Sequence, residues 1–499
     1  MTNIVVIGMG YVGIPCAVLL ADVPGFTVTG VQRRSERSGW KIECLNRGKC
    51  PFEGDEPGLA ELIERVALEK KTFHVTDDYA VCKEADVILI DVQTPTDGDH
   101  VPHYDSLREV STQAGRYLQP GTLVIIESTV APGTTQHVVQ PILERESGLE
   151  VGQRRQGDKE TRGGEDSQFY LAFSYERVMP GKLLEYITDF PRVVGGINEE
   201  SARRAVELYR HIVRGEITPT GVLTAEMAKV VENAYRDANI AFANEVALAC
   251  ERMGVNVFEV QELINARPDR HMHLPGAGVG GHCLPKDSWL LQYGLETYGK
   301  RGDKETRGQG DKGKEGLYSP SALRLIPLAR EINDDMPNRM VALIEETLAE
   351  AGRALAGARV VLLGAAYLEN ADDTRNTPAA ALAKLLLASG AEVMAHDPYV
   401  REGDWRRALG DGVDVPLTSD LWEALKGADC AALVTQHREY QALDLLRVKD
   451  VMRTPALVDG RNVFDAAHCV RAGFVVRAIG KGPYERHKDS MQEGRIGQE

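Results

Sequence analysis

The sequence predicts an α/β protein in which two Rossmann-like parallel-sheet domains are joined by a central helical domain. Three observations support this fold class. Short β-rich runs, of which NIVVIG, TVTGVQ, DVILIDV and TLVIIEST are the clearest, alternate with helical stretches in the first part of the chain. A long helix without Gly or Pro is expected from Leu223 to about Met253. A second α/β series begins at RVVLLGAAY and continues through AEVMAHDP, CAALVT and PALVDGRN.

These patterns divide the chain into four parts, with boundaries expected at residues 1–215, 216–330, 331–480 and, for a polar tail, 481–499. Two polar inserts, at about 152–167 and 300–316, interrupt the plan. Both contain the heptapeptide GDKETRG, at Gly157–Gly163 and again at Gly302–Gly308. Neither insert has a large apolar anchor, so neither buries enough surface to offset the entropy of ordering. We therefore expect mobile surface segments there.

The composition is that of a soluble globular protein. Hydrophobic residues make up 43% of the 499 residues and charged residues 26%, and the net charge is −16. This negative charge argues against nucleic acid or an anionic membrane surface as the main partner. The uncharged stretch Ile4–Ala21 follows no basic segment and is broken by Gly8, Gly10, Gly13 and Pro15. It therefore fits a buried strand turning into a helix better than a signal peptide or a membrane span.

Cysteine usage indicates a reducing compartment. The eight cysteines form no CxxC pair and no dense framework, a pattern typical of reduced cytoplasmic thiols rather than disulfides or structural zinc. No metal site is predicted. The eight positions are Cys16, Cys44, Cys50, Cys82, Cys250, Cys283, Cys430 and Cys469.

The segment VVIGMGYVGIP predicts a dinucleotide site. Gly8 allows the tight turn after the first strand, Gly10 lets a pyrophosphate approach the backbone, and Gly13 lets the helix pack closely. The helix N-terminus then offers N–H donors to the phosphates. The alternative is a tight turn of the same shape that binds nothing.

The end of the second strand leaves the choice between NAD and NADP open. An acid that bonds the adenosine ribose is usual at this place, but the strand ends Val31-Gln32-Arg33-Arg34. Gln32 can bond a hydroxyl without charge. Arg33 and Arg34 fit either a 2′-phosphate contact or a solvated turn.

The stretch LPGAGVGGHCLPKDSWLL is the most informative about chemistry. Its glycines let a bulky ligand approach, and Cys283 lies between His282 and Lys286, where a thiolate nucleophile is favoured over an inert buried thiol. Upstream, Lys229 and Asn233 fall one turn apart on the long helix; a solvated face is the alternative.

Two further segments contribute candidates for the site. ESTVAPGTT places Ser128 and Thr129 at a strand end, where α/β folds present ligand-binding residues. YERVMPG supplies Glu176, a candidate general base whose alternative is an ordinary exposed glutamate.

Taken together, these segments resemble the UDP-glucose/GDP-mannose dehydrogenase family from Asn3 to about Asp465, apart from the inserts. The matching motifs, in family order, are GMGYVGIP, ESTVAPGTT, ERVMPG, PRVVGG, AEMAKVVENAYRD, GVGGHCLPKD, DDTRNTP and VDGRN. The GGHC form, with His282 before the cysteine, is similar to the branch that acts on UDP-N-acetylhexosamines, above all UDP-N-acetylmannosamine. UDP-N-acetylglucosamine is the other acetylated candidate, and UDP-glucose or GDP-mannose is the alternative substrate.

The resemblance implies a two-step, four-electron oxidation with NAD as cofactor and NADP as the alternative. Cys283 would attack the C6 aldehyde to give a thiohemiacetal, and a second hydride transfer would give a thioester. Glu176 is implied as the base for hydrolysis, and Thr129 as a group that positions water. Lys229 and Asn233 would stabilise the oxyanion, and Asp287 would support proton transfer with Lys229.

The resemblance also implies the binding residues. The cofactor is expected at Gly8, Gly10, Tyr11, Val12, Gly13, Gln32, Arg33, Thr94, Thr129 and Lys286. The UDP-sugar is expected at Glu176, Arg177, Lys229, Asn233, Arg267, Arg270, Gly280 and Arg375, with the C-terminal domain holding UDP and Arg375 reaching the sugar. Arg267 or Arg270 would reach the site of a neighbouring subunit in a homodimer or higher homo-oligomer.

Three positions depart from the family pattern. Gln32 replaces an acid, Leu368 stands where a substrate-side lysine is common, and Tyr175 replaces the proline before Glu176. A nucleotide-sugar-binding protein that has lost catalysis is therefore one alternative, against which the intact Cys283 and its partners weigh. A β-hydroxyacid dehydrogenase is another, but it leaves Cys283 and the C-terminal α/β domain unexplained. The implied role is in polysaccharide biosynthesis.

Overall fold

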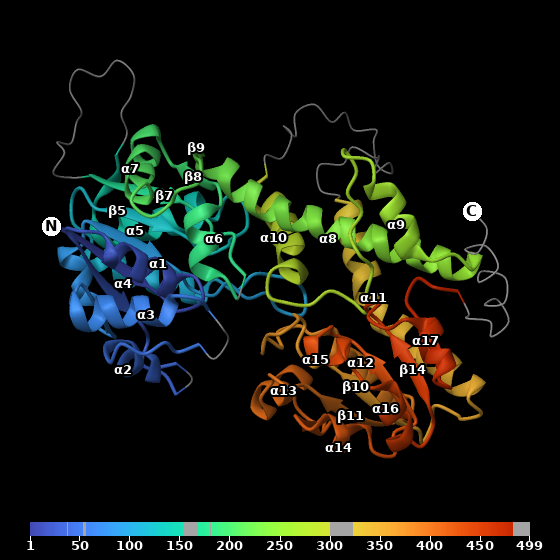
Figure 1. The fold of residues 1–499 in the computed structure, drawn as a ribbon. Helices are drawn as coiled ribbons and strands as arrows, with labels where there is room; N and C mark the ends of the chain where they lie inside the picture. The colour runs from blue at the N-terminus through green and yellow to red at the C-terminus, as the bar shows by residue number, and fades with distance from the viewer. Residues whose placement is uncertain (37, 53–55, 153–167, 180, 300–322, 483–499) are drawn as a thin grey trace, which may run out of the picture. The chain divides into compact units, whose positions relative to one another are not determined.

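The computed structural model describes residues 1–36, 38–52, 56–152, 168–179, 181–299 and 323–482 (Figure 1). Both GDKETRG segments lie outside the described residues. The chain forms two compact units: the first comprises the described residues of Met1–Glu232 and Trp289–Ala322, and the second those of Asn233–Ser288 and Leu323–Glu499. Helices α8 (Val222–Met253) and α10 (Leu284–Tyr298) each contribute residues to both units.

The sheet of the first unit has the strand order β3-β2-β1-β4-β5-β7-β8-β9, with β6 pairing β7. The central strands β4 and β5 are apolar throughout and fully buried, as expected for parallel strands covered on both faces. All pairs are parallel except β7 with β8, where Ala172 lies opposite Gly196. The bounds are β1 Thr2–Ile7, β2 Phe26–Val31, β3 Phe73–Thr76, β4 Val87–Ile90, β5 Leu123–Ile126, β6 Glu150–Val151, β7 Gln168–Phe173, β8 Arg192–Gly196 and β9 Ile217–Gly221.

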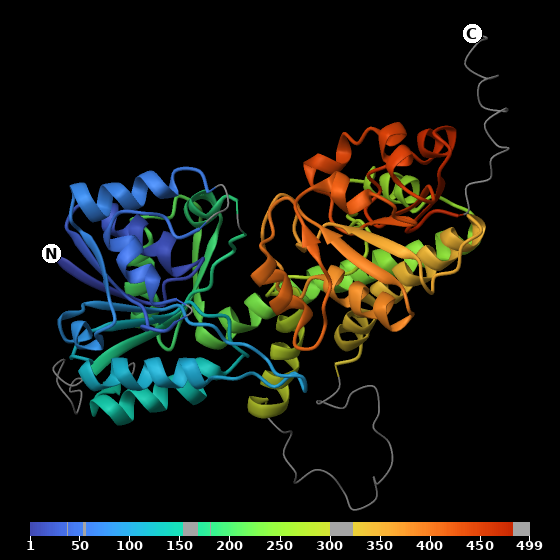
Figure 2. The ribbon, with the colours of Figure 1, turned by 90° about the horizontal axis from the view of Figure 1, so that it is seen from below.

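Helices cover both faces of this sheet. On one face, Ile4 and Val6 of β1 share a core with α1 (Gly13–Asp22) and α7 (Glu199–Tyr209). On the opposite face α4 and α5 pack together as a pair (Figure 2). The remaining helices of the unit are α2 Trp40–Asn46, α3 Leu59–Glu64, α4 Asp105–Tyr117, α5 Gln140–Ser147 and α6 Leu183–Asp189.

The second unit contains a six-stranded sheet of order β12-β11-β10-β13-β14-β15 in which every pair is parallel. This is the doubly wound order of a Rossmann domain, with its switch point between β10 and β13. The strands are β10 Arg359–Leu363, β11 Glu392–His396, β12 Leu417–Thr418, β13 Cys430–Leu433, β14 Ala456–Asp459 and β15 Val475–Ala478.

Helices of the second unit join this sheet to the C-terminal part of α8. One core contains Ala243 and Ala247 of α8, Val257 of α9, Met336 of α11 and Val360 of β10. The helices are α9 Val257–Asn265, α11 Leu325–Glu350, α12 Pro378–Ala388, α13 Glu402–Leu409, α14 Leu421–Leu425, α15 Arg438–Gln441, α16 Leu445–Val451 and α17 Ala466–Arg471.

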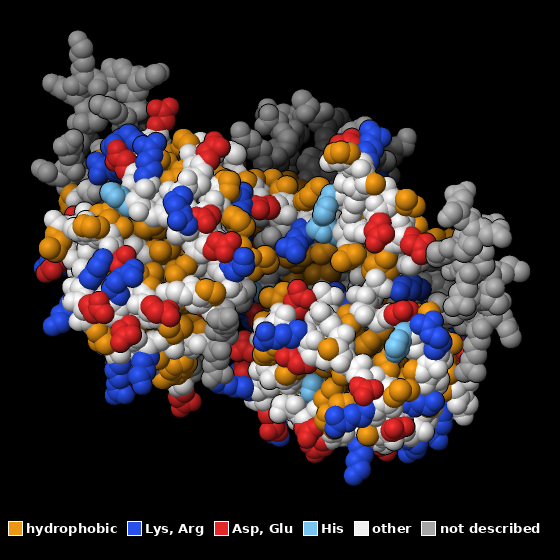
Figure 3. Space-filling view, in the orientation of Figure 1, with side chains coloured by type: hydrophobic (Ala, Val, Ile, Leu, Met, Phe, Trp, Pro, Cys, Tyr) orange, Lys and Arg blue, Asp and Glu red, His pale blue; other side chains and the backbone are white. Residues whose placement is uncertain are grey.

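The predicted fold class, two Rossmann-like α/β domains with a helical region between them in the sequence, is confirmed. The long helix expected from Leu223 to about Met253 begins at Val222 and ends at Met253. The antiparallel pairing of β8 is a detail that the β-rich pattern did not predict. Among the described helices, none combines the length and apolarity needed to cross a bilayer. On the face shown in Figure 3, acidic and basic side chains are interspersed on both units.

Candidate active site

The glycine-rich turn after β1 has the geometry expected of a dinucleotide site. Gly8 has φ +112°, and a Cβ there would lie 2.2 Å from the carbonyl oxygen of Asp91. A Cβ on Gly13 would lie 2.0 Å from the Gly8 oxygen, whereas a Cβ on Gly10 would meet no protein atom within 4 Å. Gly8 and Gly13 are thus required by the protein itself. Gly10 faces open space at the start of α1, where the helix N-terminus favours a phosphate.

The side chains at the end of β2 contact the glycine-rich turn and neighbouring acidic residues. The Oε1 atom of Gln32 accepts a hydrogen bond from the Met9 amide at 3.1 Å, so this side chain braces the glycine-rich turn. Arg34 is exposed and forms ion pairs with Asp77 and Glu43, both at 2.9 Å. Arg33 is exposed and lies 3.7 Å from Glu109. Tyr11, in the turn, stacks on Phe52 with ring centroids 4.4 Å apart, and Val12 precedes α1.

The loop ESTVAPGTT is fixed to its surroundings by buried polar contacts. The hydroxyl of Thr94 donates to the backbone oxygen of Thr129 at 2.6 Å, and the amide of Val92 donates to Ser128 Oγ at 2.8 Å. Glu226 of α8 accepts hydrogen bonds from the amides of Gly133 at 2.6 Å and Thr135 at 2.8 Å. These bonds hold Thr129 at the carboxyl ends of β4 and β5.

Glu176 is buried, contrary to the ordinary exposed glutamate considered from the sequence. Its carboxylate accepts a hydrogen bond from Nη1 of Arg192, the first residue of β8. Burial raises the pKa of Glu176 to about 7, against the lowering effect of Arg192. A carboxylate with such a pKa is suited to exchange protons near neutral pH.

The neighbours of Glu176 include two other predicted residues. The ammonium of Lys229 donates to the backbone oxygen of Glu176 at 2.9 Å. Arg177 forms an ion pair with Glu232 of α8 at 2.9 Å. Tyr175, which replaces the family's proline, is buried and accepts a hydrogen bond from Arg177 at 3.0 Å. The tyrosine is therefore integrated into the site and ties the segment to α8 through Arg177 and Glu232.

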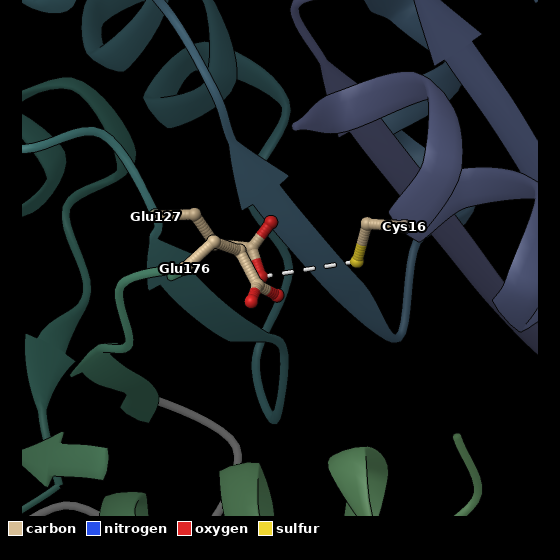
Figure 4. A group of neighbouring side chains, drawn as sticks. All are labelled: Cys16, Glu127 and Glu176. Carbon is tan, nitrogen blue, oxygen red and sulfur yellow. Dashed lines mark hydrogen bonds between the residues drawn. The ribbon is translucent and has the colours of Figure 1, made fainter. Parts of the chain in front are cut away.

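Glu176 belongs to a buried polar network that also contains Cys16, Glu127, Arg192 and Tyr209. Figure 4 shows Cys16 of α1, Glu127 after β5 and Glu176 directed toward one another; their potential ligand atoms lie within 4.8 Å of one another. Arg192 also donates to Glu127, which accepts the Tyr209 hydroxyl at 2.6 Å as well. Because the guanidinium already supplies a fixed positive charge between the two carboxylates, a metal ion has little electrostatic advantage here.

In the second unit, Cys283 is exposed and directly precedes α10. Its backbone oxygen accepts from the amides of Lys286 at 3.1 Å and Asp287 at 2.9 Å. Helix N-termini favour negative charge, here that of a thiolate. Asn233 donates to Asp287 at 2.5 Å, and Lys286 lies 3.6 Å from the other Asp287 oxygen.

The C-terminal domain holds the cysteine loop. The amide of Gly281 donates to the Arg375 backbone oxygen at 2.8 Å, and Asn376 donates to the Gly281 oxygen at 3.0 Å. A Cβ on Gly280 would lie 2.5 Å from the Cβ of Tyr367, so this glycine is required by close packing. Asp373 accepts two hydrogen bonds from the Arg375 guanidinium, at 2.9 and 2.5 Å.

The cations around the cysteine loop are paired with carboxylates, Arg375 with Asp373 and Lys286 with Asp287. Burial lowers the pKa of the Arg375 guanidinium, but Asp373 raises it by more, and Tyr367 and Cys283 add to the rise. Burial, aided by Lys286 and Arg375, lowers the pKa of His282 to about 3, so its imidazole is neutral. Arg267 and Arg270 are exposed, and both pair with Asp269, at 2.6 and 2.7 Å.

The structure therefore assembles the predicted residues in two sets. Thr94, Thr129, Glu176, Arg177 and Lys229 belong to the first unit with the glycine-rich turn; Asn233, Gly280, Cys283, Lys286, Asp287 and Arg375 belong to the second. Lys229 and Asn233 lie one turn apart on α8. Glu127 and Arg192 were not predicted as site residues from the sequence. Each is a charged residue next to an apolar run, which is the signal that could have identified it. Glu127 directly follows LVII, and Arg192 directly precedes VVGG.

Three family models together match most of the chain. The NAD binding domain of the UDP-glucose/GDP-mannose dehydrogenase family matches residues 2–213, the central domain 223–303 and the UDP binding domain 361–466.

Individual relatives extend the match along the chain. A UDP-N-acetyl-D-mannosamine dehydrogenase from Pyrococcus horikoshii is 36% identical over 481 residues, covering 96% of this chain and 99% of the relative. Among solved structures, an NDP-N-acetyl-D-galactosaminuronic acid dehydrogenase from Methanosarcina mazei Go1 is 39% identical with a TM-score of 0.79, covering 96% of this chain and 95% of the other. A UDP-D-ManNAc dehydrogenase from Pyrococcus horikoshii is 35% identical with a TM-score of 0.80, covering 96% and 99%. The chain is an NAD-binding enzyme that belongs to the UDP-glucose/GDP-mannose dehydrogenase family.

Proposed function

We propose that this enzyme oxidises UDP-N-acetylmannosamine at C6 to the uronate, with two NAD reduced per sugar and Cys283 as the covalent nucleophile. The observation that carries the proposal is the exposed Cys283 at the N-terminus of α10, beside the hydrogen-bonded pair of Asn233 and Asp287. A thiol so placed suits attack on an aldehyde far better than it suits a structural role. The Pyrococcus horikoshii relative is named for UDP-N-acetyl-D-mannosamine, which supports the choice of sugar.

Cys283 acts after the first oxidation. Its sulfur adds to the C6 aldehyde to form a thiohemiacetal, and loss of hydride from C6 gives a thioester. Water then adds to the thioester carbonyl, the C–S bond breaks, and the carboxylate leaves with the thiol restored. Asn233, held by Asp287 at 2.5 Å, is oriented to donate to the oxyanion at C6. Lys229 has the same role, and Asp287 supports the transfer of its proton.

Glu176 is the base for hydrolysis and Thr129 positions the water. A carboxylate with a pKa of about 7 accepts a proton from water and returns it near neutral pH. Arg177, Gly280 and Arg375 contribute to sugar binding.

The glycine-rich turn fits NAD, because the open face of Gly10 and the free N-terminus of α1 suit a pyrophosphate. Tyr11, Val12, Gln32, Arg33, Thr94, Thr129 and Lys286 would complete the cofactor site. When bound, NAD would supply the hydride acceptor for both oxidation steps.

The division of labour follows the predicted domains. We assign cofactor binding to residues 1–215, the catalytic loop to 216–330 and UDP binding to 331–480. The absence of a CxxC pair from the sequence supports a cytoplasmic location. The product, a negatively charged uronate, suits polysaccharide biosynthesis.

We also propose a homodimer formed through α8. Large apolar residues recur on one face of this helix and are exposed: Leu223, Met227, Val231, Tyr235 and Phe242. One such face can pack against its own copy about a two-fold axis. Arg267 or Arg270 would then serve the partner's site. Light scattering on the wild type and on Tyr235→Glu/Phe242→Glu tests this: a dimer that the double variant converts to monomer is expected, and a wild-type monomer contradicts it.

A galacto-configured sugar is the second candidate. The Methanosarcina mazei structure is named for N-acetyl-D-galactosaminuronic acid, and its identity to this chain is 39%. The test is a panel of UDP-N-acetylmannosamine, UDP-N-acetylglucosamine, UDP-N-acetylgalactosamine, UDP-glucose and GDP-mannose, with NADH absorbance and product mass recorded. We expect UDP-N-acetylmannosamine to give the highest kcat/KM. A tenfold preference for UDP-N-acetylgalactosamine would favour the second candidate, and one for UDP-glucose or GDP-mannose would refute both.

A further inference from the structure

The network behind Glu176 contains more acids than bases. Glu127 after β5 and Glu176 after β7 both accept hydrogen bonds from one guanidinium, that of Arg192, and Asp91 after β4 lies close enough to Glu127 for their charges to interact. The side chains of Glu127 and Arg192 are 0% and 2% exposed. If all three carboxylates were ionised, the cluster would bury an uncompensated negative charge, which is very costly.

The hydrogen bonds of Arg192 show how its charge is divided. Nε donates to Ser174 at 2.8 Å, Nη1 to Glu176 and Nη2 to Glu127. The flat face of the guanidinium lies over the ring of Tyr209, 3.4 Å from its centroid. One cation therefore serves both glutamates.

Two oxygens of the cluster lack a donor among the described residues. Oε1 of Glu127 accepts from Arg192, from Tyr209 and, at 3.8 Å, from Cys16. In contrast, Oε2 of Glu127 and Oδ2 of Asp91 are buried and have no hydrogen-bond donor among the described residues. The two carboxyl groups are within hydrogen-bonding reach of each other. A single proton between them would satisfy both oxygens and remove one buried charge.

We propose that Glu127 and Asp91 share one proton and that Glu127 is thereby a positioning residue for Glu176, because it takes part of the Arg192 charge and leaves Glu176 as the carboxylate that titrates. This inference rests on the proposed role of Glu176 in hydrolysis. Asp91 also abuts the glycine-rich turn, since its backbone oxygen lies against Gly8. The acid pair thus lies between the cofactor turn and the proposed base.

The charges around Glu176 define the expected direction of change. Burial and the charge of Glu127 raise its pKa, and Arg192 and Lys229 lower it. Burial and the charge of Glu127 also raise the pKa of Asp91 well above its usual value. The titratable and charged groups that face the cluster come from six other elements or their ends: Cys16, Asp91, Glu127, Arg192, Tyr209 and Lys229.

The test compares Glu127→Gln with Asp91→Asn in the full-length enzyme, with Glu61→Gln, on the exposed surface of α3, as the matched control. In Glu127→Gln, the negative charge of the acid pair would reside on Asp91, away from Glu176. Arg192 would then pair with Glu176 as its only charged glutamate. The pH profile of thioester hydrolysis is followed with NAD and UDP-N-acetylmannosamine. The midpoint of its acidic limb should then move to lower pH by about one unit. In Asp91→Asn, the negative charge of the acid pair stays on Glu127, so the midpoint of the acidic limb should move to higher pH. Glu61→Gln should leave it unmoved.

Infrared difference spectra between the wild type and each variant provide a readout that does not depend on catalysis. Well above pH 7, where Glu176 is ionised, the wild type should show a buried carboxylic-acid band that both Glu127→Gln and Asp91→Asn abolish and Glu61→Gln retains. If one buried variant does not fold, the other carries the same test. Retention of the band in the buried variants would overturn the shared proton. Loss of the band with an unmoved pH limb would overturn the positioning role. Full turnover of Glu176→Gln would instead refute the proposed function of Glu176.

Discussion

A matched pair of alanine substitutions in the glycine-rich turn separates cofactor binding from folding. A Cβ at position 13 would lie 2.0 Å from the Gly8 oxygen, more than 1 Å inside the ordinary contact range of 3.4–4 Å. Overpacking of this kind costs about 1–3 kcal/mol, which at ~2–4 °C per kcal/mol lowers Tm by roughly 2 to 12 °C. At position 10 the new Cβ meets no protein atom within 4 Å, so Gly10→Ala should melt like the wild type.

The same pair differs in the response to NAD. A methyl group at position 10 would stand where the pyrophosphate approaches, and we expect at least a tenfold loss in affinity, or about 1.4 kcal/mol. At a wild-type saturation of 100 Kd, NAD stabilises the protein by about 2.7 kcal/mol, and a tenfold weaker site halves this gain. Differential scanning fluorimetry with and without NAD measures both effects. A Gly10→Ala protein with an undiminished NAD shift, or a Gly13→Ala protein with an unchanged Tm, would refute this account of the turn.

Three further predictions concern the inserts, cofactor choice and pH. Replacing Gly157–Gly163 and Gly302–Gly308 with short Gly/Ser linkers should leave turnover within a few-fold of wild type, and loss of folding would contradict that. Because Arg34 is held by Asp77 and Glu43 at 2.9 Å, kcat/KM should favour NAD over NADP, and an NADP preference would count against it. Burial raises the pKa of Glu226 to about 7, so its stabilising contribution is full below its unfolded pKa and is lost as the pH rises through 7. Tm should therefore fall more between pH 5 and 8 in the wild type than in Glu226→Gln, and parallel curves would exclude this.

Much of the fold follows from local patterns. The runs VILI and LVII are apolar enough to specify buried parallel strands, and α8 begins within one residue of its expected start. The spacing of Gly8, Gly10 and Gly13 predicts the dinucleotide-binding turn, because each glycine meets a different steric requirement of the backbone.

The rest depends on contacts between segments distant in the sequence. Glu127 and Arg192 are 65 residues apart, and Tyr209 lies 82 residues from Glu127, so no local spacing reveals their network. The burial of Glu176 arises from the same packing, since an isolated YERVMPG segment is polar enough to face solvent. The antiparallel pairing of β8 with β7 likewise has no signal in the β8 residues RVVGG themselves.

The most direct test of the central claim is the stoichiometry of Cys283→Ser. Serine preserves the size of the side chain, but its hydroxyl is a far weaker nucleophile than a thiolate, so thioester chemistry should fail while NAD and the UDP-sugar still bind. We expect steady-state turnover to fall by several orders of magnitude, with oxidation stopping at the aldehyde or at an adduct that mass spectrometry detects. A Cys283→Ser enzyme that makes two NADH per sugar at a near-normal rate would contradict covalent catalysis by Cys283.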